Sequence, residues 1–393
     1  MNPAGLTGLV AALGVAQIIS WGTLYYSISV LGPAMRAELG ISETLVFGAF
    51  TAGLLVSGGL GPVAGRLIDT KGGRAVMSAG SIIAALSMAV LAAAPNREVF
   101  IAGWLLAGVA MSMTLYDPAF ATLSQHAGDR YRRMVTVLTL LGGFASTVFW
   151  PISHVLEEAW GWRAAFGVYA ALHLLVCLPV HAALIPRLAR KPHADAGSPS
   201  NERSPAFDDP RLKWLNASFA IASFVVGVVA VHMVGLLTTV GLTTAQAVAA
   251  AMLLGPMQVA GRIGEMAFLS RQRSAFVGAL SFALIGVSVL ALAIASGITP
   301  LAIAFVAIFG CGNGIFTIVR GAAPAELFGG RGLGELLGHL SRASLFARAL
   351  APGSYSLILA LGLTQPVGMA LLALLVAAGL ACFTLAARPS HSR

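Results

Sequence analysis

Long apolar segments alternate with short polar ones along the whole chain. A helix that crosses ~30 Å of hydrocarbon needs roughly 20 apolar residues. Runs of that length recur from the first residues to the last, and the connections at 95–98 and 297–300 leave room only for tight turns. The pattern predicts twelve membrane-spanning helices, numbered here as spans 1 to 12, near residues 7–31, 44–66, 75–94, 99–123, 134–156, 164–186, 214–237, 245–267, 275–296, 301–322, 336–361 and 366–387.

One long polar segment interrupts this pattern, between spans 6 and 7. Residues 187–213 are rich in Pro, Ser, Asp and Arg. Such a composition cannot bury a core and is typical of a flexible linker. The expected organisation is therefore an N-terminal six-helix bundle at 1–186, a cytoplasmic linker at 187–213 and a C-terminal six-helix bundle at 214–393.

The composition excludes a soluble enzyme, a nucleic-acid-binding protein and a disordered protein. Charged residues make up 10% of the chain and hydrophobic residues 58%, whereas a soluble domain carries about 25% charged residues. The net charge of +9 does not indicate a nucleic-acid partner, because the basic residues form no single patch. The three cysteines lie inside apolar runs without metal-ligand spacing. With no Walker loop and no HExxH motif, we expect neither an enzyme nor a bound metal or cofactor.

The basic residues predict the orientation in the membrane. Cytoplasmic loops are enriched in Lys and Arg. One set of alternate loops and termini holds seventeen of these residues, and the opposite set holds only Arg36, Arg97 and Arg163. We therefore expect both termini and the linker to be cytoplasmic. Arg outnumbers Lys 21 to 3, which hints at a GC-rich bacterial genome and hence at a multi-pass protein of the bacterial inner (plasma) membrane.

The two halves of the chain echo each other. Residues 65–69 at the end of span 2 recur as 261–265 at the end of span 8, and Pro151 in span 5 matches Pro352 in span 11. The offsets are close to half the chain, and six spans per repeat give both halves the same orientation. The repeats predict a pseudo-two-fold axis along the membrane normal.

Two motifs resemble a known family. The segment Gly65-x-x-x-Asp69-Thr70-Lys71-Gly72-Gly73-Arg74 is similar to the G-x-x-x-D-R/K-x-G-R-R signature between spans 2 and 3 of the major facilitator superfamily, with Thr70 where a basic residue is usual. The run Gly161-Trp162-Arg163 is also typical of that superfamily. With twelve spans and a central linker, the chain resembles the superfamily over essentially its whole length. The resemblance implies an all-α membrane protein of two six-helix bundles, a monomer, with alternating access to a central site.

The resemblance also indicates a branch of the superfamily and a conformational latch. Residues 320–329 look like the monocarboxylate and oxalate/formate branches, and the span 4 and span 5 motifs usual in drug/proton antiporters are missing. The signature implies a conformational latch, formed by Gly65, Asp69, Lys71, Gly72 and Arg74. Asp69 lies where span 2 leaves the membrane and can face the positive end of a helix. Alternatively, the basic residues serve only as positive-inside anchors.

Ionisable residues deep in the spans are costly and therefore candidates for function. Four arginines qualify, against two acids, Asp117 and Glu265. Arg262 and Glu265 are three residues apart and can pair, which leaves an excess of guanidinium groups suited to an anion. Arg348 falls near the midplane, where transporter sites are expected. The arginines are, in chain order, Arg262, Arg320, Arg342 and Arg348.

Polar side chains also recur at helical spacing in four spans, which puts each set on one face. The resemblance implies that these spans line or border the central path. The candidate substrate-binding residues are Gln17, Trp21 and Tyr25 in span 1, Gln258 and Arg262 in span 8, Asn313 and Arg320 in span 10, and Arg348 and Tyr355 in span 11. The alternative for Arg320 and Arg348 is a structural bond to helix carbonyls or to Asp117. Arg262 either binds a carboxylate or belongs to a degenerate second latch.

Two residues are candidates for proton coupling. Burial of Asp117 would favour its protonated form; the alternative for Asp117 is a salt bridge to Arg74 or Arg130. An imidazole can change its charge near physiological pH, which makes His154 the second candidate; the alternative for His154 is simple packing.

We expect a secondary transporter in the lipid bilayer that moves a small organic anion, such as a monocarboxylate, with protons. The alternative is an exporter of uncharged or amphipathic compounds (drug or metabolite efflux). A membrane sensor is disfavoured, because the linker is too short and polar to fold as a module.

Overall fold

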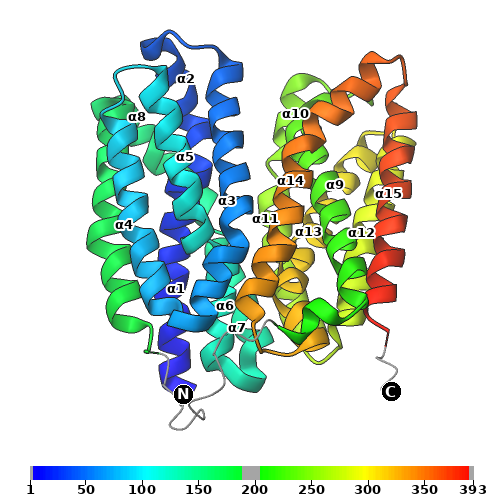
Figure 1. Cartoon of the computed structure of the whole chain (residues 1–393). Coiled ribbons are helices and arrows are strands. Elements are labelled where there is room, and N and C mark those ends of the chain that lie inside the picture. Colours follow the sequence, from blue (N-terminus) through cyan, green and yellow to red (C-terminus); the bar gives the residue numbers. More distant parts are fainter. Residues whose placement is uncertain (1–2, 188–203, 389–393) are drawn as a thin grey trace. The chain divides into compact units, whose positions relative to one another are not determined.

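The computed structural model describes residues 3–187 and 204–388. Most of the predicted linker, at 188–203, lies outside the described residues, as does Arg393 at the C-terminus. The chain divides into two compact units (Figure 1): unit 1 comprises Met1–Ser204 and Gly330–Arg342, and unit 2 comprises Pro205–Gly329 and Ala343–Arg393. The division into 1–186, 187–213 and 214–393 stays a prediction.

All regular secondary structure in the described residues of unit 1 is helical. Three of its elements, η1, η3 and η4, are π-helical turns, and η2 is a 3-10 turn. The elements are α1 (Pro3–Trp21), η1 (Gly22–Tyr26), α2 (Ser27–Leu39), α3 (Glu43–Lys71), α4 (Gly73–Ala92), α5 (Arg97–Thr114), α6 (Tyr116–Ala127), η2 (Gly128–Arg130), α7 (Tyr131–Gly142), α8 (Ala145–Leu172), η3 (His173–Cys177), η4 (Val180–Leu184) and the first turns of α14 (Leu333–Ala360).

Unit 2 is helical in the same way and takes in the rest of α14. Its first element, η5, is a 3-10 turn, and η6 is a π-helical turn. The elements are η5 (Pro205–Asp208), α9 (Arg211–Thr239), α10 (Thr244–Ala251), α11 (Leu254–Gly264), η6 (Glu265–Leu269), α12 (Ser274–Ala293), α13 (Thr299–Phe328), α14 from residue 343 onward, and α15 (Gln365–Ala386).

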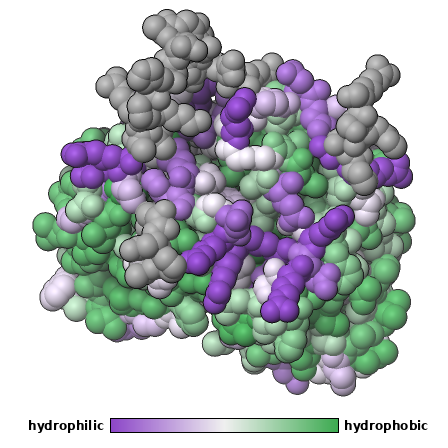
Figure 2. All heavy atoms as spheres, turned by 90° about the horizontal axis from the view of Figure 1, so that it is seen from below, coloured by the Kyte–Doolittle hydropathy of each residue, from purple (hydrophilic) through white to green (hydrophobic). Residues whose placement is uncertain are grey.

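The helices have the length and apolar character of membrane spans. Within the described residues, nine helical segments are long and apolar enough to cross a membrane. The longest, Arg97–Leu184, takes in three predicted spans, and α14, which carries several charges, covers a further one. Every predicted span thus has a helical counterpart. Hydrophilic side chains gather on the face seen in Figure 2, whereas the rim of that view is mostly hydrophobic.

Some predicted spans are not single helices. The span predicted at 99–123 consists of α5 and α6, with Leu115 extended between them (φ −77°, ψ −160°). Helix α8 runs through the end of predicted span 5 into span 6 and breaks at Gly161, whose φ of +78° is a left-handed value. Glycine adopts such a value without strain, so Gly161 makes the turn between the two spans.

This turn is held by the two residues that follow it. Trp162 Nε1 donates to Glu38 Oε2 (2.5 Å) and Arg163 Nε donates to Glu38 Oε1 (2.7 Å). A third donor, Arg163 Nη1, reaches the carbonyl oxygen of Ala92 (2.9 Å). The Gly161-Trp162-Arg163 run therefore ties the ends of α2 and α4 to the turn within α8.

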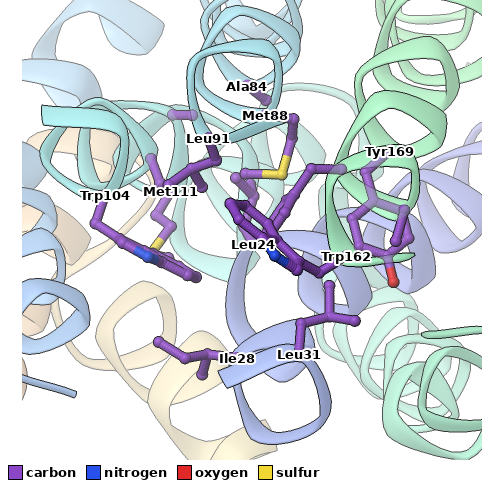
Figure 3. Packing of buried hydrophobic residues seen from close by; sticks show 14 of the residues in the cluster. Leu24, Ile28, Leu31, Ala84, Met88, Leu91, Trp104, Met111, Trp162 and Tyr169 are labelled. Atoms are coloured by element: carbon purple, nitrogen blue, oxygen red, sulfur yellow. The ribbon is translucent and has the colours of Figure 1, made fainter. Parts of the chain in front are cut away.

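The core of unit 1 is built around large aromatic and aliphatic side chains. Trp104 and Tyr169 are fully buried, and Met88 and Leu24 lie in the same cluster (Figure 3). Helices α3 and α5 approach closely through small residues, as is common between membrane helices. A Cβ placed on Gly108 would lie 2.1 Å from the carbonyl oxygen of Gly53, so this crossing requires glycine.

Unit 2 uses the same kind of packing. A Cβ on Gly261 of α11 would lie 2.4 Å from the carbonyl oxygen of Cys311, and one on Gly314 of α13 would lie 2.2 Å from that of Gln258. Helices α11 and α13 are thus in backbone contact over about a turn. The contact holds the predicted polar residues of the two helices side by side.

Candidate functional site

The predicted latch residue Asp69 lies near the end of α3 and contacts the beginning of α14. Its Oδ1 accepts a hydrogen bond from the backbone N–H of Gly334 (2.9 Å), and its Oδ2 accepts one from that of Glu335 (2.8 Å). The first N–H groups of a helix have no partner within the helix and carry a partial positive charge. The carboxylate therefore caps α14 both geometrically and electrostatically.

Glycines bring α3 and α14 into backbone contact beside this cap. A Cβ on Gly65 would lie 1.9 Å from the carbonyl oxygen of Gly334, and one on Gly338 would lie 2.2 Å from that of Gly61. No side chain fits at either position without separating the helices. The first glycine of the signature is thus explained by contact with α14.

Of the remaining predicted latch residues, Gly72 shapes the turn after α3. Gly72 has a φ of +84° and its N–H bonds the carbonyl oxygen of Ile68 (2.8 Å), which ends α3 and allows α4 to begin at Gly73. Gln125 of α6 supports this turn, since its Nε2 also donates to the carbonyl oxygen of Ile68 (2.8 Å). Lys71 is exposed and Arg74 half-buried.

Sequence reasoning missed three ionisable residues beside this cap, Arg66, Glu335 and His339. Arg66 forms an ion pair with Glu335, whose side chain is only 8% exposed. His339 Nε2 lies 3.9 Å from Glu335 Oε1. The available signal was the Gly334-x-x-x-Gly338 spacing with an acid in the first turn of a helix, which matches Gly61-x-x-x-Gly65 on α3.

The predicted stripe on span 1 meets the break between α5 and α6. Gln17 is fully buried, and its Nε2 donates to the carbonyl oxygen of Thr114 (2.6 Å) and lies 3.4 Å from that of Leu115. Its Oε1 accepts from Trp21 Nε1 (3.1 Å). Gln17 thus satisfies a carbonyl group at the break and orients the indole of Trp21.

Aromatic rings gather around Trp21. Its centroid lies 5.1 Å from that of Tyr25 and 5.0 Å from that of Tyr116, the first residue of α6. These rings are half-buried, so part of their surface is accessible. We call this set the aromatic cluster, which comprises Trp21, Tyr25, Tyr26, Phe50, Tyr116 and Trp150.

The two proton-coupling candidates have different surroundings. Asp117 is half-buried in the first turn of α6, where the helix N-terminus favours a carboxylate. The side chain of His154 is 62% exposed, and its Nε2 lies 3.5 Å from Oε1 of the equally exposed Glu158. His154 therefore occupies the outer surface of α8.

In unit 2, four of the predicted substrate-binding residues lie on the adjoining helices α11 and α13. Arg262 of α11 is 4% exposed, and Glu265, at the start of η6, is 1% exposed. Gln258 of α11 is half-buried and adjoins Gly314 of α13. Along α13, Asn313, Thr317 and Arg320 are all half-buried, and Thr317 donates to the carbonyl oxygen of Asn313 (3.0 Å).

Arg348 lies in α14 and packs against α9. Its Cγ would be 3.2 Å from a Cβ placed on Gly227. The residue is half-buried, and its Nε is buried without a hydrogen-bond partner in the part of the chain that the structure describes. Tyr355, two turns further on, packs against Gly368 of α15, and its ring lies 5.2 Å from that of His232 between centroids, in a tilted arrangement.

The Major Facilitator Superfamily matches the chain over residues 13–352. The chain belongs to this superfamily. It is therefore a multi-pass membrane protein and a secondary transporter of a small molecule, and not an enzyme. The fold resembles the crystal structure of the transporter FucP in its outward conformation, with a TM-score of 0.77 at 14% identity over 97% of this chain and 99% of that one. It also resembles the human organic anion transporter MFSD10, with a TM-score of 0.74 at 15% identity over 98% and 100% of the two chains.

Sequence relatives match only parts of the chain. A gentisate transporter of Corynebacterium glutamicum is 27% identical over 53% of this chain and 47% of its own length. Monocarboxylate transporter 3 of Rattus norvegicus is 30% identical over 30% of this chain and 24% of its own. The multidrug resistance protein MdtL of Citrobacter koseri is 26% identical over 43% of both. Each match spans less than half the length of the relative.

Proposed function

We propose that this transporter moves a small organic anion, with a carboxylate as the charged group, together with protons. The observation that carries the proposal is Arg348, a half-buried arginine in a membrane helix whose Nε has no partner among the described residues. A charge inside a membrane is costly and normally paired. A guanidinium fork matches the two oxygens of a carboxylate, so a substrate carboxylate would satisfy Arg348.

The other candidate residues have supporting roles. Arg320, Asn313, Gln258 and Arg262 supply further polar groups in unit 2, and Tyr355 orients α14 against α15. Within unit 1, the half-buried rings of Trp21 and Tyr25, held by Gln17, stay candidates for contact with apolar groups. We propose that substrate binding and release follow alternating access, with the capping of α14 by Asp69 as the latch.

The relatives are consistent with this proposal and with its alternative. The gentisate and monocarboxylate transporters agree with an anionic substrate. The multidrug resistance protein agrees with the alternative, an exporter of uncharged or amphipathic compounds in which the arginines are structural. We further propose a monomer in the bacterial inner membrane with both termini cytoplasmic, because basic residues are enriched in one set of loops.

A ligand screen by thermal shift tests the proposal. Purified wild type, Arg348→Gln and the matched control Arg342→Gln, an exposed position on the same helix, are heated with metabolites sorted by charge. A ligand at 100 times its Kd adds about 2.7 kcal/mol to the native state. Small carboxylates should stabilise the wild type and Arg342→Gln but not Arg348→Gln. Stabilisation of all three proteins by uncharged or lipophilic compounds alone would favour the exporter.

A further inference from the structure

A buried histidine on η3 has a defined tautomer. His173 is fully buried, and its Nε2 lies 2.8 Å from Oγ1 of Thr23. The Thr23 hydroxyl donates its single hydrogen to the carbonyl oxygen of Ile19 (2.8 Å). Thr23 therefore accepts from His173, and the imidazole proton sits on Nε2. The other ring nitrogen, Nδ1, carries a lone pair.

That lone pair has no hydrogen-bond partner. Within the described residues, Nδ1 of His173 is buried and unbonded, and so is Nε2 of His181, two helical turns further on. His181 is anchored through Nδ1, which lies 2.8 Å from Ser81 Oγ. A buried acceptor without a partner costs about 1–3 kcal/mol. Such groups call for an explanation beyond packing, and an imidazole lone pair is a proton acceptor.

Among the described residues, no carboxylate acts electrostatically on His173. Elements α1, α4, α8 and η4 pack against η3, and α1 contains no ionisable side chain. Of the other titratable groups, His181 is the one that acts on His173 electrostatically. The remaining ones on these elements, on η1 and on η3 itself are Arg74, His154, Glu157, Glu158, Arg163, Tyr169, Tyr25, Tyr26 and Cys177. Of these, Arg163 is bound to Glu38 and Tyr169 to Ser153.

The hydrogen bond of His173 also reaches the aromatic cluster. Thr23 belongs to the π turn η1, between Trp21 and Tyr25, and His173 begins the π turn η3. Single π turns inside α-helices occur frequently at functional sites. Gly22, beside Thr23, admits the ring of Phe149, since a Cβ there would lie 2.2 Å from that ring. Protonation of His173 would therefore act directly on its hydrogen-bond partner Thr23, which lies in the same turn as Tyr25.

We propose that His173 is the residue that binds the coupling proton, which adds to the lone pair of Nδ1 and leaves from the same atom. This inference rests on the proton coupling proposed above. Burial among uncharged groups favours the neutral imidazole in the conformation described here. Proton binding favours a second conformation in which η1 and η3 separate and water reaches Nδ1. Proton and substrate are then coupled, because both bias the same two states.

Transport by proteoliposomes separates the possible outcomes. We choose His173→Gln, whose amide keeps an N–H donor for Thr23 and cannot take up a proton, with His181→Gln as the matched control. Lactate serves as the carboxylate probe. We expect His173→Gln to lose accumulation driven by a pH gradient but to keep lactate counterflow, and His181→Gln to behave as the wild type. Gradient-driven accumulation by His173→Gln equal to that of the wild type would overturn the inference.

A second measurement needs neither substrate nor variant. Exchange of the imidazole C2 hydrogen, followed by mass spectrometry, reports the titration of each histidine in the wild type. We expect the C2 hydrogen of His173 to exchange, because this exchange requires a protonated ring in contact with water, and the proposed second conformation supplies both. Absence of any exchange at His173, while exposed histidines such as His154 exchange, overturns the role of His173.

The transport assay tests the proposed function separately. Lactate counterflow by the wild type without gradient-driven accumulation refutes the proposed proton coupling itself.

Discussion

The carboxylate of Asp69 accepts a hydrogen bond from the backbone N–H of Glu335 at 2.8 Å, which fixes the end of α3 to the first turn of α14. The side chain of Glu335 in turn pairs with Arg66 of α3. Arg348 lies thirteen residues further along the sequence of α14. The predicted latch residue Asp69 thus contacts the helix that also carries the candidate anion-binding arginine.

Replacing Asp69 with Asn should weaken the cap on α14. The amide oxygen can still accept one hydrogen bond, but the negative charge at the helix N-terminus is lost. Burial raises the pKa of the Asp69 carboxyl, so we attribute the effect mainly to the lost hydrogen bond. An N–H group left without its acceptor costs about 1–3 kcal/mol, and we expect a lower thermal unfolding temperature. Glu98→Gln, which removes an exposed acid paired with its neighbour Arg97, is the control. Equal unfolding temperatures for Asp69→Asn and the wild type would contradict the cap.

Gly65→Ala should force α3 and α14 apart. Its Cβ would lie 1.9 Å from the carbonyl oxygen of Gly334, whereas a Cβ on Gly59 of the same helix would meet nothing within 4 Å. Overpacking of this kind costs typically ~1–3 kcal/mol, while Ala in an open helical position is slightly favoured over Gly. Thermal unfolding should rank Gly65→Ala below the wild type and Gly59→Ala level with it or above. Two alanine variants of equal stability would refute the close contact.

Gln17→Leu should destabilise the break in span 4. The substitution leaves the buried carbonyl oxygen of Thr114 without its partner, which costs about 1–3 kcal/mol, and it also removes the acceptor of the half-buried indole N–H of Trp21. Trp21→Phe removes only one of these hydrogen bonds, so its loss of stability, measured by thermal unfolding, should be smaller. A Gln17→Leu variant as stable as the wild type would mean that the break does not depend on Gln17.

The helices were predictable, whereas their irregularities were only partly so. Apolar run length predicts each span, because the membrane thickness sets it. The break at Leu115 is invisible in hydropathy, although Asp117-Pro118 just after it is typical of a helix start. The π turns at Gly22–Tyr26 and His173–Cys177 leave no mark in the composition.

The sequence predicts individual residues of the candidate site, but not their contacts with distant parts of the chain. The stripe of Gln17, Trp21 and Tyr25 follows from helical spacing, and their rings and amide do meet. The partners of Asp69 could not be derived, because Glu335 is 266 residues away in the chain and the contact depends on tertiary packing. Similarly, His173 is fully buried whereas His154 is exposed, and this difference is a property of the fold that the sequence pattern does not show.

Uptake of a small carboxylate by proteoliposomes tests the central claim most directly. Wild type and Arg348→Gln are reconstituted at equal density and supplied with labelled lactate, with and without an inward proton gradient. We predict gradient-stimulated lactate uptake by the wild type and loss of uptake by Arg348→Gln, while Arg342→Gln keeps it. Equal uptake by the wild type and Arg348→Gln would contradict an anion site at Arg348.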